Sequence, residues 1–203
     1  MRIGIAHRDI KPHNVLLFEE SPGMYVAEIA DLGYSVQLND GELEKMPRST
    51  PWEAPEWHHR WHTRARIFKM DVYSFGMVCL WLLFKERLSD SGIAFDAKSY
   101  ENSQLREAKM KDWLCAISRD LVFKATGLST NQVESLIEFF NSCLLYDIDK
   151  RDEKMERLIE LLGGEMVVHS TNNAELSNPM QTEPFSVSKT TILLLKYVRR
   201  EYY

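Results

Sequence analysis

Two short polar stretches near the start of the chain carry residue types that can do chemistry together. Residues 7–14 read HRDIKPHN and place a carboxylate (Asp9), an amine (Lys11) and an amide (Asn14) on one loop. A second carboxylate, Asp31, follows seventeen residues after Asn14. Oxygen atoms that hold a metal, a cation that faces a phosphate and a group that orients a hydroxyl are the parts that phosphoryl transfer requires. These four side chains therefore indicate phosphoryl transfer as the candidate chemistry.

Two further stretches follow in order, Ala54-Pro55-Glu56 and residues 71–76, which read DVYSFG. Together with HRDIKPHN and the Asp-Leu-Gly that begins at Asp31, they resemble the catalytic loop, DFG turn, APE sequence and long central helix of eukaryotic protein kinases. A Lys two residues after Asp9 resembles the serine/threonine branch. The resemblance implies a mainly α fold with a short β-hairpin, like the larger lobe of a protein kinase.

The resemblance implies a role for each polar side chain of the site. Asp9 would accept or orient the hydroxyl of a protein substrate, and Lys11 would lie against the transferred phosphate of ATP. Asn14 and Asp31 would hold Mg²⁺, which prefers oxygen ligands and keeps phosphates and waters in its shell. Asp9 and Lys11 are thus the expected catalytic residues, and Lys11, Asn14 and Asp31 the expected ATP–magnesium ligands.

Residues 34–53 resemble the activation segment of the family, and residues 48–52 resemble its substrate-docking turn. The segment is polar, with a turn signal at residues 39–41 and two prolines, so we expect a mobile surface segment bounded by anchors. Arg8 would receive a phosphate carried by this segment. The candidate phosphate carriers are Ser35, Ser49 and Thr50.

Two long-range contacts are also implied by the resemblance. Asp71 would accept backbone N–H groups of the catalytic loop, and the alternative is an ordinary charge at a helix start. Arg151 would form a buried pair with Glu56, although Asp152 stands where the family has Pro. An exposed Arg at a helix start is the alternative for Arg151.

Hydrophobic patterns predict the elements that position these groups. Apolar runs at residues 14–18 and 25–30, separated by a Pro-Gly turn signal, predict a β-hairpin with a longer loop. Residues 70–84 are apolar in every helical direction, which predicts a helix buried on all sides. After a polar loop at 86–103, three helical patterns follow: residues 105–125, residues 133–144 behind a Ser129–Gln132 capping box, and residues 155–162.

Residues 1–164 form the expected kinase-like domain, followed by a linker at 165–188 and a final helix at 189–203. Only six residues precede the catalytic loop, and the sequence has no GxGxxG. We therefore expect a larger lobe without the N-terminal lobe, inactive or weak alone, with apolar surface that a partner would cover. A non-catalytic interaction module is the main alternative. A metal-dependent hydrolase ranks last, because it needs a second metal-ligand cluster.

Composition narrows the remaining classes. The 203 residues are 44% hydrophobic and carry a net charge of −5, which argues against binding to nucleic acid. The longest apolar run, residues 77–84, is too short for a membrane span. Three scattered cysteines and the lack of a signal sequence suggest an intracellular protein, cytoplasmic or nuclear. Three histidines at 58, 59 and 62 lack further metal ligands and are interpreted as part of a surface loop that packs its tryptophans.

Overall fold

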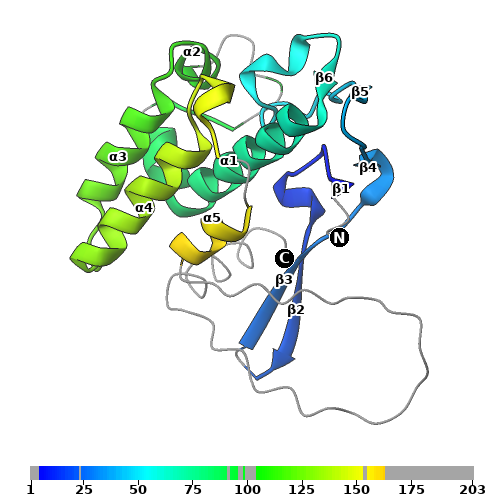
Figure 1. Ribbon diagram of the computed structural model, residues 1–203. Coiled ribbons are helices and arrows are strands. Elements are labelled where there is room, and N and C mark those ends of the chain that lie inside the picture. Colours follow the sequence, from blue (N-terminus) through cyan, green and yellow to red (C-terminus); the bar gives the residue numbers. More distant parts are fainter. Residues whose placement is uncertain are drawn as a thin grey trace.

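The computed structural model describes residues 5–22, 24–90, 92–95, 98, 104–152 and 155–162, which form a helical body and a projecting β-hairpin (Figure 1). The expected mainly α fold with a short hairpin is therefore observed. The helices are α1 (Arg64–Asp90), α2 (Gln104–Met110), α3 (Leu114–Lys124), α4 (Thr130–Cys143) and α5 (Met155–Leu161). The predicted linker at 165–188 and helix at 189–203 lie outside the described residues.

Helix α1 runs through the core of the helical body and contacts α3 and α4. It is longer than the predicted 70–84, and its last turns include residues expected in a polar loop. The reason is Leu88, which is 1% exposed and lies one turn after the buried Phe84, while Glu86 and Arg87 are exposed. By length and composition α1 is apolar enough to cross a bilayer, but 72% of its most apolar stretch is buried in the protein. This burial is typical of a core helix.

A glycine allows α1 and α4 to approach closely. A Cβ atom built on Gly76 would lie 2.5 Å from the Cβ of Cys143 and 3.0 Å from the Cδ2 of Leu144. The Cβ of Cys143 is attached directly to the backbone and cannot rotate away, so an added methyl group would force the helices apart. The crossing of the two helices therefore depends on the absence of a side chain at residue 76.

The predicted single helix at 105–125 is wrong, because the chain breaks between α2 and α3. Asp112 has a φ of 56°, and its Oδ1 accepts a hydrogen bond from the backbone N–H of Tyr146 at 2.9 Å. The break lets α2 bury Leu105 while α3 separately buries Leu121. The capping box that begins α4 is confirmed, with Ser129 and Gln132 each bonding the other's backbone N–H.

The predicted hairpin is present as β2 (Val15–Ser21) and β3 (Met24–Ile29) in antiparallel register, with Val15 opposite Ile29. Strand β2 extends three residues beyond the predicted run and β3 starts one residue earlier than predicted, so the connection is shorter than expected. In Figure 1 the hairpin extends away from the helices. Its large apolar side chains Leu16, Phe18 and Ile29 are 45–48% exposed.

The segment at 34–53, expected to be a mobile surface segment bounded by anchors, is exposed over most of residues 39–45 and is also anchored at two points within its length. Strand β4 (Val36–Gln37) pairs with β1 (Ile5–Ala6), and β5 (Leu43–Glu44) pairs with β6 (His62–Thr63). Between and after these strands, Leu38 and Met46 are 6% and 8% exposed. The short strand pairs supply backbone hydrogen-bond partners for this polar segment. Its two buried apolar side chains pack in the core.

Candidate active site

The catalytic loop is held by a carboxylate from α1. Asp71 accepts the backbone N–H of His7 on Oδ2 at 2.7 Å and that of Arg8 on Oδ1 at 2.8 Å. The predicted contact is therefore confirmed. Burial raises the pKa of Asp71 to about 6, although the two N–H groups act in the opposite direction. The same bonds hold Arg8 at a φ of 67°, a conformation that L residues rarely adopt.

Asp9, Lys11 and Asn14 lie together in this loop. The Asp9 side chain is 3% exposed, and its Oδ2 accepts hydrogen bonds from Lys11 Nζ at 2.6 Å and Asn14 Nδ2 at 3.0 Å. Burial raises the pKa of Asp9, but hydrogen bonds from Lys11, Ser49 and Asn14 outweigh it, so the pKa is below its usual value. Asp9 is therefore an ionised acceptor at neutral pH.

Asn14 directly precedes β2 and Asp31 follows shortly after β3, so the hairpin brings both residues to the same end of the strand pair. The backbone N–H of Ala30 donates to the carbonyl oxygen of Asn14 at 2.8 Å, and His7 Nε2 lies 2.9 Å from the carbonyl oxygen of Ala30. Asp31 follows directly, with an exposed side chain whose Oδ1 accepts the N–H of Gly33 at 3.2 Å. The predicted metal ligands thus come from adjacent points of one small unit.

The donor chemistry of this unit fits Mg²⁺. The Nδ2 of Asn14 donates to the carbonyl oxygen and to Oδ2 of Asp9, and the amide oxygen lies at the other end of the group. Within the described residues, no group of three or more His, Cys, Asp and Glu side chains could hold a metal by itself. Two oxygen donors suit an ion that takes its other ligands from phosphates and waters.

Arg8 already has partners in the activation segment. Its Nε donates to the carbonyl oxygen of Tyr34 at 2.5 Å and its NH1 to that of Lys45 at 2.7 Å. Its NH1 also lies 3.5 Å from Oε1 of Glu44. The sequence did not single out Glu44, because only the fold brings it to the catalytic loop.

The docking turn is fixed by a lysine that the sequence also missed. Lys109 is 2% exposed, and its Nζ donates to the carbonyl oxygens of Pro51 at 2.8 Å and Glu53 at 2.6 Å. Burial lowers the pKa of Lys109 to about 8, against the charges of Glu53 and Glu56, which raise it. The available signal was its place beside Ala108, on the apolar side of α2.

The predicted pair between Arg151 and Glu56 is confirmed. The guanidinium of Arg151 bonds the two carboxylate oxygens at 2.7 and 3.3 Å, and its side chain is fully buried. The same guanidinium donates to the backbone carbonyl oxygen of Leu145 at 2.7 Å. These hydrogen bonds connect Glu56 of the APE sequence to the segment between α4 and α5.

The histidines at 58, 59 and 62 do not form a metal site among the described residues. His62 is buried, and burial lowers its pKa below the ordinary value, so its ring is neutral near pH 7. Trp61 is 48% exposed, with the Lys45 ammonium 5.0 Å from its ring centroid. The expectation of a surface loop that packs its tryptophans thus holds for Trp57, which contacts the core, and fails for Trp61.

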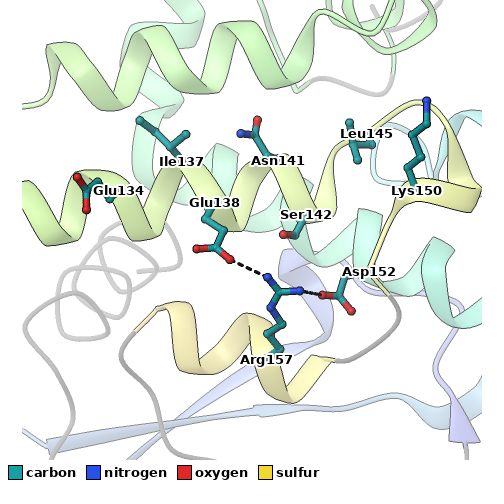
Figure 2. Close-up of a pocket in the computed structure, with 9 residues that line it drawn as sticks. All are labelled: Glu134, Ile137, Glu138, Asn141, Ser142, Leu145, Lys150, Asp152 and Arg157. Carbon is teal, nitrogen blue, oxygen red and sulfur yellow. Dashed lines mark hydrogen bonds and ion pairs between the residues drawn. The ribbon is translucent and has the colours of Figure 1, made fainter.

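A surface pocket of about 680 Å³ lies between α4 and α5, far from this chemistry (Figure 2). In it Arg157 points to Glu138 and Asp152, at 2.7 and 3.2 Å. The side chains of Arg157 and Glu138 are more than half exposed, so these ion pairs contribute little. None of the nine residues that line the pocket belongs to the catalytic loop or to the hairpin. We assign it no role in the candidate chemistry.

Comparison with known proteins agrees with this geometry. The family model of the protein kinase domain matches residues 2–160. Cysteine-rich receptor-like protein kinase 27 of Arabidopsis thaliana is 26% identical over 202 residues, which cover 94% of this chain and 28% of that protein. A putative mitogen-activated protein kinase kinase kinase 7-like protein of Drosophila melanogaster is 28% identical over 183 residues, covering 90% and 41%. The mouse serine/threonine-protein kinase TNNI3K is 37% identical over 79 residues, covering 39% and 9%.

The chain belongs to the protein kinase domain family, because the family model spans most of its length. The matched stretches cover less than half of each of these relatives. Family membership is thus established on the residues that form the catalytic loop, activation segment and helical body.

Proposed function

We propose that this chain is the catalytic-loop part of a serine/threonine protein kinase, which transfers the γ-phosphoryl group of ATP to a protein hydroxyl. The observation that carries the proposal is the buried, ionised Asp9 bonded to Lys11 at 2.6 Å. A serine hydroxyl, that of Ser49, also bonds Asp9, so this carboxylate accepts a hydroxyl of the kind a substrate would offer.

The lowered pKa of Asp9 favours one of two roles for this carboxylate. A strong general base needs a pKa near the working pH, whereas Asp9 titrates below its ordinary value. Asp9 therefore orients the substrate hydroxyl more than it removes the proton early. Lys11 places a point charge next to the same carboxylate, where it can face the transferred phosphate.

Asn14 and Asp31 hold Mg²⁺ in this proposal, and the ion when bound neutralises charge on the phosphates. Asn14 is buried and oriented by its bonds to Asp9, whereas the side chain of Asp31 is exposed. An exposed ligand surrounded by water provides little of the low-dielectric enclosure that strengthens charged groups. We therefore expect slow phosphoryl transfer from the 203-residue chain alone.

The proposed serine/threonine specificity rests on Lys11 and on the similarity to serine/threonine kinases, among them serine/threonine-protein kinase TNNI3K. An intracellular site of action is part of the proposal, and the three free cysteines, of which Cys79 and Cys143 are buried, are compatible with a reducing compartment.

The test is phosphate incorporation into a generic Ser/Thr protein substrate from radiolabelled Mg-ATP, with the wild-type chain and Asp9→Asn at high enzyme concentration. We expect incorporation at least tenfold above Asp9→Asn, at a rate below the roughly 1–100 s⁻¹ of protein kinases. Turnover within that range would contradict the expected weakness. Calorimetry of Mg-ATP binding to wild type and Asp31→Asn gives a second readout, and we expect Asp31→Asn to weaken binding.

A non-catalytic interaction module is the second candidate, and the hairpin favours it. Leu16 and Phe18 on β2 and Ile29 on β3 leave about half of each side chain exposed, on both faces of the strand pair. Apolar surface of this kind commonly marks a protein contact. Equal incorporation by wild type and Asp9→Asn, together with no Mg-ATP binding, would support this module and overturn the kinase proposal.

A further inference from the structure

The side chain of Arg8 links the catalytic loop to a carboxylate of the activation segment. Its NH1 lies 3.5 Å from Oε1 of Glu44, and it also donates to the carbonyl oxygens of Tyr34 and Lys45. The side chains of Arg8 and Glu44 are 13% and 36% exposed. The pair is therefore partly shielded from solvent, and it joins both ends of residues 34–45 to one guanidinium.

The backbone of Glu44 is fixed independently of this pair. Strand β5 pairs with β6, with Glu44 opposite His62, and β6 leads directly into α1. Helix α1 carries Asp71, which holds the backbone N–H of Arg8. Contacts therefore lead from Asp71 of α1 to Arg8 in the catalytic loop, and from Arg8 to Glu44 in the activation segment. The pairing of Glu44 with β6 leads back to α1.

The three hydroxyls of this segment that were expected to carry a phosphate to Arg8 make other bonds. Ser35 Oγ donates to the carbonyl oxygen of Leu32 at 2.7 Å, and Ser49 bonds Asp9. Thr50 Oγ1 accepts from Arg48 Nε at 2.9 Å. The activation-segment carboxylate that the structure places next to the Arg8 guanidinium is that of Glu44.

We propose that Glu44 is a positioning residue that orders residues 34–48 against the catalytic loop through Arg8, so that this order needs no phosphate. The regulatory meaning of the inference rests on the proposed kinase function, whereas the ordering itself does not. A carboxylate carries one negative charge where a phosphate would carry 1.5 to 2, and this pair is partly exposed, so the effect is modest. Order in the segment should therefore persist in protein that has been treated with a phosphatase.

The experiment compares the 203-residue wild type, Glu44→Gln and Glu44→Asp after phosphatase treatment, with Asp40→Asn as a matched control. Asp40 lies in the same segment as Glu44 and pairs with Arg64 of α1 at 3.1 Å, but the Asp40 side chain is 95% exposed. Trypsin cleavage after Lys45 is divided by cleavage of a peptide of residues 38–52 with the same substitution, which removes the effect of sequence on the protease. Hydrogen exchange of residues 34–48 is measured in parallel.

We expect Glu44→Gln to speed normalised cleavage and exchange by about two- to fivefold, and Asp40→Asn to leave both within about 1.5-fold. Glu44→Asp keeps the charge and should protect the segment better than Glu44→Gln. Unchanged protection in Glu44→Gln, or better protection by Gln than by Asp, would overturn the role of the charge. Loss of protection on phosphatase treatment of wild type would also overturn it. None of these readouts needs phosphoryl transfer, so the inference and the kinase proposal can fail separately.

Discussion

The two sides of Asp9 differ in how completely the chain encloses them. On the side of the docking turn, Ser49 bonds Asp9, Lys109 is buried beneath the turn, and Arg151 pairs with Glu56 in the interior. On the side that we propose for the nucleotide, the hairpin projects from the helical body with apolar side chains half exposed (Figure 1). Among the described residues, the side that we propose for the substrate is thus enclosed, and the side that we propose for the nucleotide is open.

This difference separates two requirements of phosphoryl transfer. Orientation of a hydroxyl needs a rigid acceptor, which a buried and well-bonded Asp9 provides. Stabilisation of charge on the phosphates needs enclosure, because electrostatic interactions weaken in water. The substrate side should therefore respond strongly to substitution, and the nucleotide side weakly.

The largest expected effect comes from the buried pair of the substrate side. Arg151→Met leaves the carboxylate of Glu56 buried without its partner, and the free energy of unfolding should fall by about 3–5 kcal/mol. Urea denaturation followed by tryptophan fluorescence measures this change. Arg157→Met is the control, because the Arg157 side chain that pairs with Glu138 and Asp152 is 55% exposed, and the loss should be much smaller than that of Arg151→Met. Equal losses of unfolding free energy in Arg151→Met and Arg157→Met would contradict a special contribution of the buried pair on the substrate side.

Lys109→Met should have an intermediate effect. The methionine retains most of the side-chain length but donates no hydrogen bond to the carbonyl oxygens of Pro51 and Glu53. We expect a loss of about 1–3 kcal/mol near pH 7 and faster proteolysis at Arg48 in the docking turn. Lys111→Met, on the exposed side of the same region, is the control and should change little.

The same variant predicts a pH dependence. The pKa of Lys109 is lowered from 10.5 to about 8 in the folded protein. Between these values the unfolded chain binds more protons than the folded chain, so the stability of wild type rises with pH. Lys109→Met lacks this contribution, and its deficit relative to wild type should be larger at pH 9.5 than at pH 7.5. A deficit that is constant or smaller at pH 9.5 would contradict the lowered pKa.

Features that depend on local sequence, or on the family resemblance, were predictable. Ser129 and Gln132 mark the start of α4 through a pattern of four residues, and the hairpin follows from two apolar runs. The contacts of Asp71 with the loop and of Arg151 with Glu56 came from the resemblance, since nothing local connects residues 56 and 151. Both pairs are present in the structure.

Features that depend on tertiary contacts were not predictable from the sequence. The polar composition of residues 34–53 suggested mobility. In the structure β4 pairs with β1 and β5 pairs with β6, and these partner strands are distant in the sequence. Lys109 lies on the apolar side of α2, but its charge predicts exposure to solvent, and its burial is stabilised by carbonyl oxygens of the docking turn. The break at Asp112 similarly depends on the N–H of Tyr146, which lies after α4.

The smallest expected effect is that of a substitution in the hairpin. It tests most directly whether the side that we propose for the nucleotide is open. Leu16 is 46% exposed on β2, whereas Leu88 is 1% exposed at the end of α1. Leu16→Ser should change the free energy of unfolding by less than about 0.5 kcal/mol, whereas Leu88→Ser should cost about 2–5 kcal/mol. Leu16→Ser should also raise the protein concentration at which the chain aggregates, because it reduces exposed apolar surface. If Leu16→Ser were as destabilising as Leu88→Ser, other parts of the chain would have to cover the hairpin, and the nucleotide side would be as enclosed as the substrate side.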